Sequence, residues 1–222
     1  MEKHIVKIIS VEPVTHDVKC FTVQKPEGYQ FEPGQATEIS INKSGWQEEK
    51  RPFTFTSLPG NDYLEFAIKT YPAHNGVTNQ LLQLKNNDEL ILHEVFGAIS
   101  YKGDGVFIAG GAGVTPFISI FRDLKTKNKI DGNVLVFANK TIADIILEKE
   151  FANMLGDAFI NILSDEKADG YHYGRLSEEF LQGIFTNFDQ QFYVCGPPPM
   201  MDAVLKQLTN LGVGEKAVTV EI

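Results

Sequence analysis

The pattern of secondary structure changes near residue 100, and this change constrains the fold more than any other feature of the sequence. Before it, short β-rich segments are separated by turn sequences such as Pro33-Gly34 and Pro59-Gly60-Asn61-Asp62. After it, apolar strands alternate with helices. Regularly spaced short strands are typical of an antiparallel barrel, and alternating strands and helices are typical of a parallel sheet covered by helices. We therefore expect two domains, an antiparallel β-barrel over residues 1–100 and an α/β domain with a parallel sheet over residues 101–222.

The same pattern gives approximate boundaries for each element. In the first half we expect one helix at 77–84 and strands at 5–11, 18–23, 36–41, 53–57 and 63–69. In the second half we expect strands at 105–109, 134–138, 159–163, 191–195 and 217–221. The helices between them are expected at 115–124, 143–154, 177–182 and 199–211.

Composition is that of a globular protein, with 43% hydrophobic and 22% charged residues in a chain of 222. The two cysteines, Cys20 and Cys195, are too few for a four-cysteine iron–sulfur cluster or zinc site, so we expect no metal. A low cysteine content, no signal sequence and no apolar run of about 20 residues lead us to expect a cytoplasmic protein outside the membrane. A net charge of −9 argues against nucleic-acid binding. We also expect the protein to be a monomer.

The strongest local signal is a glycine-rich segment, Ala109-Gly110-Gly111-Ala112-Gly113-Val114-Thr115-Pro116, which follows an apolar strand and opens a helix. Glycines let the backbone approach a ligand closely, and the N–H groups of a helix start bind phosphate. Pro116 suits the first helical turn, where its missing N–H costs nothing. The segment lacks the spacing of the Rossmann fingerprint and of the Walker A loop, so a tight turn without a ligand is the alternative interpretation.

A second turn, Cys195-Gly196-Pro197-Pro198, ends another apolar strand. We expect it at the carboxyl edge of the parallel sheet, where open α/β sheets bind ligands. A helix-start turn with a buried cysteine is the alternative, and no histidine lies near Cys195 in the sequence to make it a nucleophile.

Two segments of the first half also carry groups suited to a flat phosphorylated cofactor. In Arg51-Pro52-Phe53-Thr54 a guanidinium can bind phosphate, a ring can stack and a hydroxyl can hydrogen-bond. Alternation along a strand places Arg51 and Phe53 on one face and Thr54 on the other. The segment His74-Asn75-Gly76-Val77-Thr78-Asn79-Gln80-Leu81 begins a helix with a glycine and a hydroxyl. Taken singly, an ordinary strand and an ordinary turn explain these two segments equally well.

As a set, these four segments resemble the ferredoxin–NADP reductase superfamily in their order and spacing, and the similarity extends nearly to Glu221. In that family the barrel binds a flavin, usually FAD, and the α/β domain binds a nicotinamide dinucleotide. The resemblance implies an oxidoreductase that passes a hydride from NADH or NADPH to bound FAD, with FMN the less favoured flavin. Electrons would then pass to a separate acceptor.

The resemblance also implies roles for individual residues. Arg51 would contact the flavin phosphates, Phe53 would pack on the isoalloxazine and Thr54 would hydrogen-bond the ring nitrogen that accepts hydride. Cys195 would border the nicotinamide, so Thr54 and Cys195 are the two predicted catalytic positions. The other predicted contacts with the flavin are Pro52, Lys69, His74, Gly76, Val77 and Thr78. The other predicted contacts with the dinucleotide are Gly111, Gly113, Thr115, Pro116, Gly196 and Pro197.

Three features depart from the family or bear on the choice of substrate. Phe53 stands where the family usually has Tyr, so stacking is retained and the phenol hydrogen bond is lost. No aromatic residue follows Tyr193, so we expect no C-terminal ring over the flavin. Ser164-Asp165-Glu166 follows the strand 159–163, and an acidic residue there favours the 2′-hydroxyl of NADH over the 2′-phosphate of NADPH. Basic residues nearby leave NADPH open: Lys140, Lys167 and Arg175.

The sequence does not identify the electron acceptor. A flavodoxin or ferredoxin is one interpretation, and such an acidic carrier would need a local basic patch, which we expect around Lys43 and Lys50. The alternatives are reduction of a small acceptor such as free flavin or a ferric chelate, or a role as the electron-transfer subunit of a larger oxidoreductase. A non-catalytic module that binds a dinucleotide is the remaining alternative.

Overall fold

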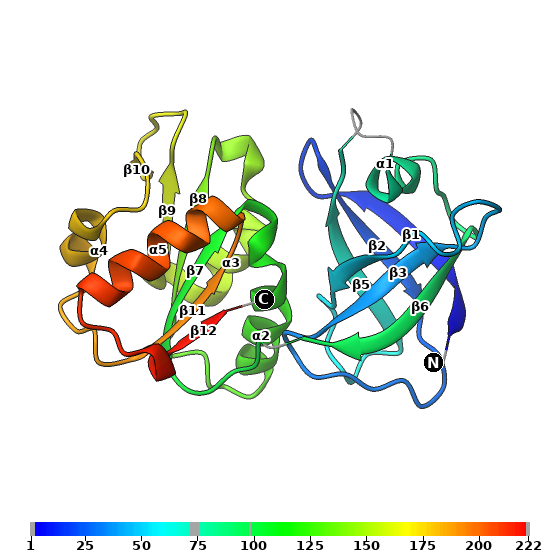
Figure 1. Ribbon diagram of the computed structural model, residues 1–222, viewed down its shortest axis with the longest axis horizontal. Coiled ribbons are helices and arrows are strands. Elements are labelled where there is room, and N and C mark those ends of the chain that lie inside the picture. Colours follow the sequence, from blue (N-terminus) through cyan, green and yellow to red (C-terminus); the bar gives the residue numbers. More distant parts are fainter. Residues whose placement is uncertain (1–2, 72–75, 98, 221–222) are drawn as a thin grey trace. The chain divides into compact units, whose positions relative to one another are not determined.

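The computed structural model describes residues 3–71, 76–97 and 99–220, and it consists of two compact units, each built on a six-stranded sheet (Figure 1). The first unit contains Met1–Ser100 together with Thr115–Asp123. The second contains Tyr101–Val114 together with Leu124–Ile222. The fold class is therefore the predicted one, an antiparallel barrel and a parallel α/β sheet.

The strands of the first unit are antiparallel and lie in the order β4-β3-β6-β1-β2-β5. Their bounds are β1 (His4–Pro13), β2 (Val18–Gln24), β3 (Ala36–Ile41), β4 (Arg51–Thr54), β5 (Tyr63–Lys69) and β6 (Glu89–Phe96), and one short helix, α1 (Val77–Leu81), precedes β6. Strand β6 lies between β3 and β1, and the sequence patterns did not predict it. Its central residues Leu90, Ile91 and Leu92 are all buried, so the alternation that identifies a half-buried strand is absent.

The sheet closes into a barrel where β4 ends. Thr54 is the last residue of β4 paired with β3, and the chain then turns toward β5. The N–H of Thr56 donates to the carbonyl oxygen of Glu65 at 2.8 Å, and the N–H of Glu65 donates to Oγ of Ser57 at 3.1 Å. These bonds link the segment that follows β4 to β5, the strands at the two ends of the strand order. This change of partner explains why the strand spans 51–54 and the prediction of 53–57 was wrong.

Aromatic side chains fill the barrel. Phe21, Phe55 and Phe66 are fully buried, and the ring of Phe55 stacks on that of Phe31 with centroids 4.2 Å apart. Trp46, in the loop after β3, is half-buried and packs against this core.

The second unit is a parallel sheet in the order β10-β9-β8-β7-β11-β12. Its strands are β7 (Gly105–Gly110), β8 (Val134–Asn139), β9 (Phe159–Leu163), β10 (His172–Tyr173), β11 (Gln191–Cys195) and β12 (Val218–Val220). The helices after Gly110 are α2 (Thr115–Thr126), α3 (Glu148–Leu155), α4 (Glu178–Ile184) and α5 (Pro198–Asn210). All six residues of β7 are buried, as expected for a central parallel strand.

Helices cover both faces of this sheet. On one face, Leu181 of α4 and Val204 of α5 share a core with Val136 of β8. On the other face, Phe151 of α3 meets the ring of Phe137, the next residue along β8, edge to face at 6.4 Å. Most of α2, from Thr115 to Asp123, belongs to the barrel unit.

Two helices are shorter than the sequence predicted. After Leu81, the chain continues in tighter turns, in which the N–H of Leu84 donates to the carbonyl oxygen of Leu81, so α1 does not reach residue 84 as an α-helix. The expected helix 143–154 is broken at Leu147, which adopts a left-handed conformation with φ 53° and starts α3 one residue later. Within the described residues, no helix is long and apolar enough to cross a membrane.

Candidate functional site

The glycine-rich turn and the Cys195-Gly196 turn lie against each other at the carboxyl edge of the parallel sheet. Strands β7 and β11 are neighbours, with Ala109 opposite Cys195. A Cβ atom at Gly113 would lie 2.3 Å from the carbonyl oxygen of Cys195 and 2.6 Å from Cα of Gly196. Glycine is needed at position 113 because backbone atoms of the second turn occupy the space that a side chain would fill.

The other glycines of this region pack in different ways. A Cβ at Gly110 would lie 2.2 Å from Sδ of Met200 on α5, whereas a Cβ at Gly111 would meet nothing within 4 Å. Gly111 instead has a positive φ of 50°, which starts the 3-10 turn Gly111–Val114 before α2. The two turns therefore meet backbone against backbone at Gly113, and we call this pair of turns the cradle.

The predicted dinucleotide contacts differ in exposure. Thr115 and Pro116 are buried within the first turn of α2, while Gly111 and Gly113 are half-buried. Cys195 is buried with 5% exposure, and Pro197 is exposed. The predicted contacts that solvent can reach are thus Gly111, Gly113, Gly196 and Pro197. The side chains of Cys195 and Thr115 are not among them.

Asn139, the last residue of β8, is a polar residue at the same edge of the sheet. Its side chain is 8% exposed, and neither of its amide atoms has a hydrogen-bond partner within the described part of the chain. Beyond β9, Oγ of Ser164 donates to Asp165 at 2.7 Å, and the carboxylate of Glu166 accepts the N–H of Ile142 at 2.9 Å. Acidic groups therefore lie beside the ends of β8 and β9, as the sequence suggested.

In the barrel unit, the predicted flavin contacts on β4 become less exposed to solvent along the strand. Arg51 and Pro52 are exposed, Phe53 is half-buried against the barrel core, and Thr54 is 7% exposed. The Arg51 guanidinium donates to the carbonyl oxygen of Lys50 at 2.6 Å and lies 3.9 Å from the Glu49 carboxylate. An exposed guanidinium at a strand end, whose partners among the described residues are local, is well placed to bind an anionic group.

Lys69, at the end of β5, is paired within the barrel. Its ammonium group lies 2.8 Å from the Asp17 carboxylate. Burial opposes the charge on Asp17, but the hydrogen bond and positive charge of Lys69 outweigh it and hold the pKa of Asp17 below its ordinary value. Any ligand contact by Lys69 would therefore compete with Asp17.

The predicted phosphate contacts before α1 are only partly described. Gly76 is the extended residue before the helix, Val77 is buried, and the Thr78 side chain is half-buried. His74 lies outside the described residues.

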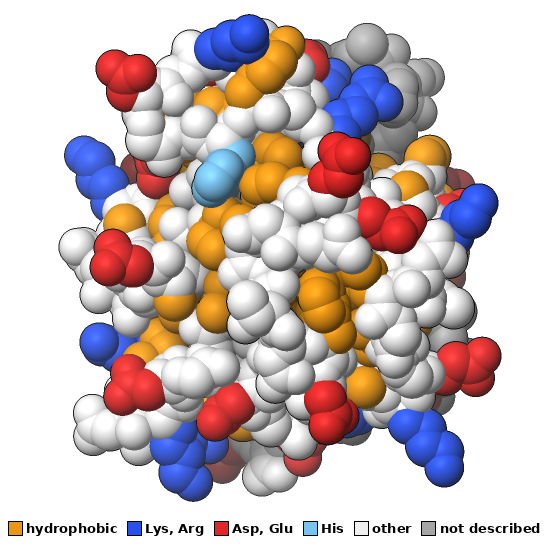
Figure 2. Space-filling model, turned by 90° about the vertical axis from the view of Figure 1, so that its left-hand side faces the viewer, with side chains coloured by type: hydrophobic (Ala, Val, Ile, Leu, Met, Phe, Trp, Pro, Cys, Tyr) orange, Lys and Arg blue, Asp and Glu red, His pale blue; other side chains and the backbone are white. Residues whose placement is uncertain are grey.

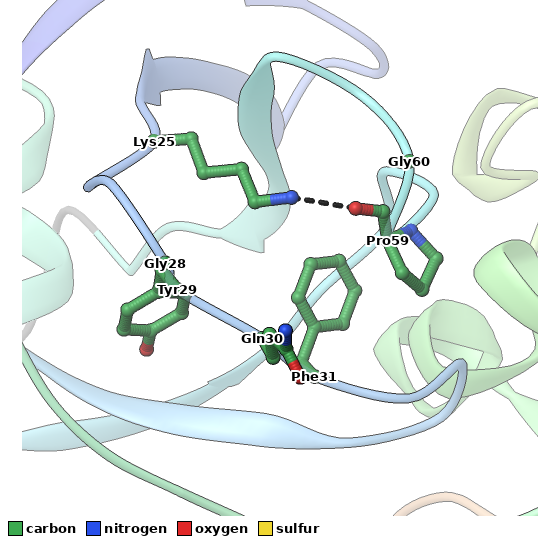
Figure 3. A pocket seen from close by; sticks show the side chains of 7 residues that line it. All are labelled: Lys25, Gly28, Tyr29, Gln30, Phe31, Pro59 and Gly60. Atoms are coloured by element: carbon green, nitrogen blue, oxygen red, sulfur yellow. Dashed lines mark hydrogen bonds between the residues drawn. The ribbon is translucent and has the colours of Figure 1, made fainter.

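The barrel also carries a separate pocket of about 500 Å³, lined by Lys25, Gly28, Tyr29, Gln30, Phe31, Pro59 and Gly60 (Figure 3). None of the predicted flavin contacts that the structure describes lines it. Figure 3 shows the Lys25 side chain reaching across to Pro59, where its ammonium group donates to the carbonyl oxygen at 2.5 Å. It also donates to the carbonyl oxygen of Asn61 at 3.2 Å, so Lys25 links the loop after β2 to the loop before β5.

Charged side chains are mixed in sign on the surfaces that could dock a carrier. The Lys43 ammonium group lies 3.9 Å from the Asp88 carboxylate, and that of Lys50 lies 3.3 Å from Glu38. These pairs reduce the local positive potential of the expected patch. On the face of the α/β unit that carries α4 and β10, Figure 2 shows acidic and basic side chains scattered among hydrophobic ones.

Comparison with known proteins identifies both units. Residues 3–128 match the FAD-binding domain model, and residues 107–206 match the oxidoreductase NAD-binding domain model. The chain is 31% identical over 223 residues to the reductase component of propane 2-monooxygenase from Mycolicibacterium goodii, covering 90% of this chain and 61% of the relative. It is also 31% identical to the glycine betaine monooxygenase reductase subunit of Pseudomonas aeruginosa, over 95% of this chain and 61% of the relative. The chain thus spans about three fifths of the length of these relatives.

Solved structures share the fold. The FAD/NAD-binding domain of nitric oxide dioxygenase from Vibrio cholerae superposes with a TM-score of 0.87 at 22% identity, covering 98% of this chain and 97% of that one. A ferredoxin NADP+ reductase from Neisseria gonorrhoeae superposes with a TM-score of 0.85 at 18% identity, covering 100% of this chain and 98% of that one.

Proposed function

Because the chain belongs to the FAD-binding domain family of the ferredoxin–NADP reductase superfamily, we propose that it is an NAD(P)H-dependent flavoprotein reductase. In this proposal residues 1–100 bind FAD and residues 101–222 bind the nicotinamide dinucleotide. The observation that carries it is the backbone cradle of Gly113 against Cys195 and Gly196, in a chain that matches both cofactor-domain families.

The residues of the barrel fit a flavin. The exposed Arg51 guanidinium, with Pro52 beside it, would bind the phosphates, and the half-buried Phe53 ring would pack on the isoalloxazine. Thr54 would offer its hydroxyl to the flavin ring, and the backbone of Gly76, Val77 and Thr78 would bind the pyrophosphate. Lys69 and His74 are the remaining proposed contacts.

The residues of the sheet edge fit a nicotinamide dinucleotide. Gly111, Gly113 and Thr115 would supply backbone N–H groups at a helix start, which suits a pyrophosphate. Pro116 has no N–H and would contribute only contact surface beside them. Cys195, Gly196 and Pro197 would border the nicotinamide. A flavin, when bound, would supply the redox chemistry, and the residues of each unit would hold and orient the cofactor that the unit binds.

An absorbance experiment tests this function. The purified protein, reconstituted with FAD, should show a flavin band that bleaches when NADH is added without oxygen. Failure to bind FAD, or a flavin that neither NADH nor NADPH reduces, would overturn the proposal.

We infer NADH as the preferred donor because Asp165 and Glu166 follow β9, where a carboxylate disfavours a 2′-phosphate. Lys167, a cation that could offset them, lies over the Tyr173 ring at 4.6 Å. Steady-state kinetics should give a higher kcat/KM with NADH, and Asp165→Arg should shift the ratio toward NADPH. Equal kcat/KM values for the two donors in the unmodified protein would contradict this preference.

The electron acceptor that we propose is a separate protein. Different observations support two classes of acceptor, a small redox carrier and a partner oxygenase. The fold is that of ferredoxin reductases, which favours a flavodoxin or ferredoxin. Sequence relatives are named as reductase components of monooxygenases, which favours a partner oxygenase instead. Reduction of free flavin or ferric chelate is the small-molecule alternative. Parallel assays with a ferredoxin, a flavodoxin, free FMN and ferric citrate distinguish them, and turnover with artificial acceptors alone would point to the partner oxygenase.

A further inference from the structure

The point where the barrel closes is held by an arginine that neither predicted cofactor site uses. Nη1 of Arg122, on α2, donates to the carbonyl oxygen of Thr56 at 2.8 Å and to Oε1 of Glu65 at 2.6 Å. Oε1 of Glu65 also accepts the Thr56 hydroxyl at 2.7 Å. Thr56, two residues beyond the end of β4, donates its N–H to the carbonyl oxygen of Glu65 on β5, so Arg122 contacts both residues of the bond that closes the barrel.

This ion pair lies largely out of solvent. The side chains of Arg122 and Glu65 are 22% and 17% exposed, and Thr56 is fully buried. The neighbouring Cys20 thiol has its pKa raised to about 12 by burial and by the Glu65 charge, so it stays protonated beside the carboxylate. Charge-assisted hydrogen bonds in such a setting are stronger than neutral ones, and removing one partner leaves the other charge poorly solvated.

A second contact from α2 involves the segment before β3, which also bonds to the chain that follows β4. Oγ of Ser119 accepts the N–H of Gly34 at 3.0 Å, and the carbonyl of the next residue, Gln35, accepts the N–H of Phe55 at 3.0 Å. Helix α2 therefore contacts both chain segments that hold Phe55 and Thr56 in place. Those two residues follow Thr54 directly in the sequence.

We propose that Arg122 is a positioning residue for the flavin, because by holding Thr56 and Glu65 it sets the exit of β4 and thereby the placement of Phe53 and Thr54. The inference rests on the proposed flavin site. It predicts an effect on the bound flavin beyond any effect on the stability of the barrel. Arg122 itself does not touch the reacting groups in this proposal.

The test uses Arg122→Lys, Arg122→Met and Glu65→Gln in the full chain, with Lys3→Met as the control. Lys3 forms an exposed ion pair with Glu48 at 2.9 Å elsewhere on the barrel. The readouts are the dissociation constant of FAD, the midpoint potential of the bound flavin, and its rate of reduction at saturating FAD and NADH. We expect Arg122→Met to weaken FAD binding by about tenfold to hundredfold. We also expect it to slow reduction at saturation, with Arg122→Lys and Glu65→Gln intermediate and Lys3→Met unchanged.

The outcomes separate positioning from simple stabilisation. If the variants melt at lower temperature but bind FAD with unchanged affinity, potential and reduction rate, the proposal is wrong. If Arg122→Met does not fold, Arg122→Lys and Glu65→Gln decide by the same three readouts. Failure of the unmodified protein to bind or reduce FAD would instead count against the proposed function, and the wild-type measurement comes first for that reason.

Discussion

The two predicted cofactor sites are built from different materials. At the sheet edge, backbone packs on backbone, with Gly113 against Cys195 and Gly196. On the barrel, the predicted contacts are side chains of graded exposure on β4, from exposed Arg51 to buried Thr54. A site made of backbone is inseparable from the packing of its unit, whereas exposed side chains can be removed without disturbing the fold. Substitutions at the sheet edge should therefore lower both stability and ligand binding, whereas removal of an exposed side chain of β4 should lower ligand binding alone.

The largest effect is expected from Gly113→Ala. The new Cβ would lie 2.3 Å from the Cys195 carbonyl oxygen, and backbone cannot move aside as a flexible side chain can. We expect a loss of roughly 3 kcal/mol in the free energy of unfolding and a large rise in the KM for NADH. Urea unfolding and steady-state kinetics measure the two quantities.

Gly111→Ala is the matched control for this substitution. Its Cβ meets nothing within 4 Å, so only the positive φ of 50° opposes it, at about 1 kcal/mol. Equal destabilisation by the two substitutions would show that glycine is needed for φ alone and would remove the argument for a packed backbone cradle.

A smaller and more selective effect is expected from Arg51→Ala. The side chain is exposed, so we expect the free energy of unfolding to change by less than about 0.5 kcal/mol. Loss of a charge-assisted phosphate contact should weaken FAD binding roughly tenfold to hundredfold. Fluorescence titration with FAD measures the change, and Lys43→Ala, which removes another exposed barrel cation, should leave it unaffected. If Arg51→Ala lowers stability as much as Gly113→Ala, the contrast between the two sites is lost.

The smallest effect concerns Asp17, whose pKa is lowered in the folded barrel mainly because Lys69 outweighs the cost of burial. A carboxyl group with a depressed folded pKa contributes stability above its ordinary pKa of 3.8, and that contribution is lost as pH falls through the folded value. Asp17→Asn should therefore cost about 1 kcal/mol or less at neutral pH. The difference from the unmodified protein should vanish in acid.

Urea unfolding at several pH values checks this, with the exposed Asp62→Asn as the control. A difference between Asp17→Asn and the parent that stayed constant down to strongly acid pH would contradict the role assigned to the Lys69 pair. Freeing Lys69 should also leave FAD binding unchanged or improved, because the ammonium group then has no competing carboxylate.

Most of the fold follows from patterns within single segments. The parallel strands at 159–163 and 191–195 have the predicted bounds because they are short apolar runs with clear flanking turns. β6 was missed because burial on both faces erases its alternation, and the break at Leu147 depends on a left-handed residue that no propensity identifies. Both failures arise where tertiary packing overrides local preference.

The candidate site divides in the same way. The glycine turn and the Cys195 turn are recognisable because glycine and proline have distinctive backbone requirements. The ion pair between Arg122 and Glu65 joins residues 57 apart, in a helix and a strand where either residue alone is unremarkable. Such a contact depends on how the chain closes the barrel, which a pattern of residue types does not reveal.

The single tryptophan lies in the barrel unit, so the unfolding of the two units can be followed by different optical signals. Trp46 packs against the barrel core, and the α/β unit contains no tryptophan in the printed sequence. Selective excitation of the indole therefore reports melting of the barrel alone, whereas circular dichroism of the helices reports mainly on the sheet unit that carries most of them. Superimposable curves from the two probes would mean a single cooperative transition, and separated curves would assign each substitution above to the unit it weakens.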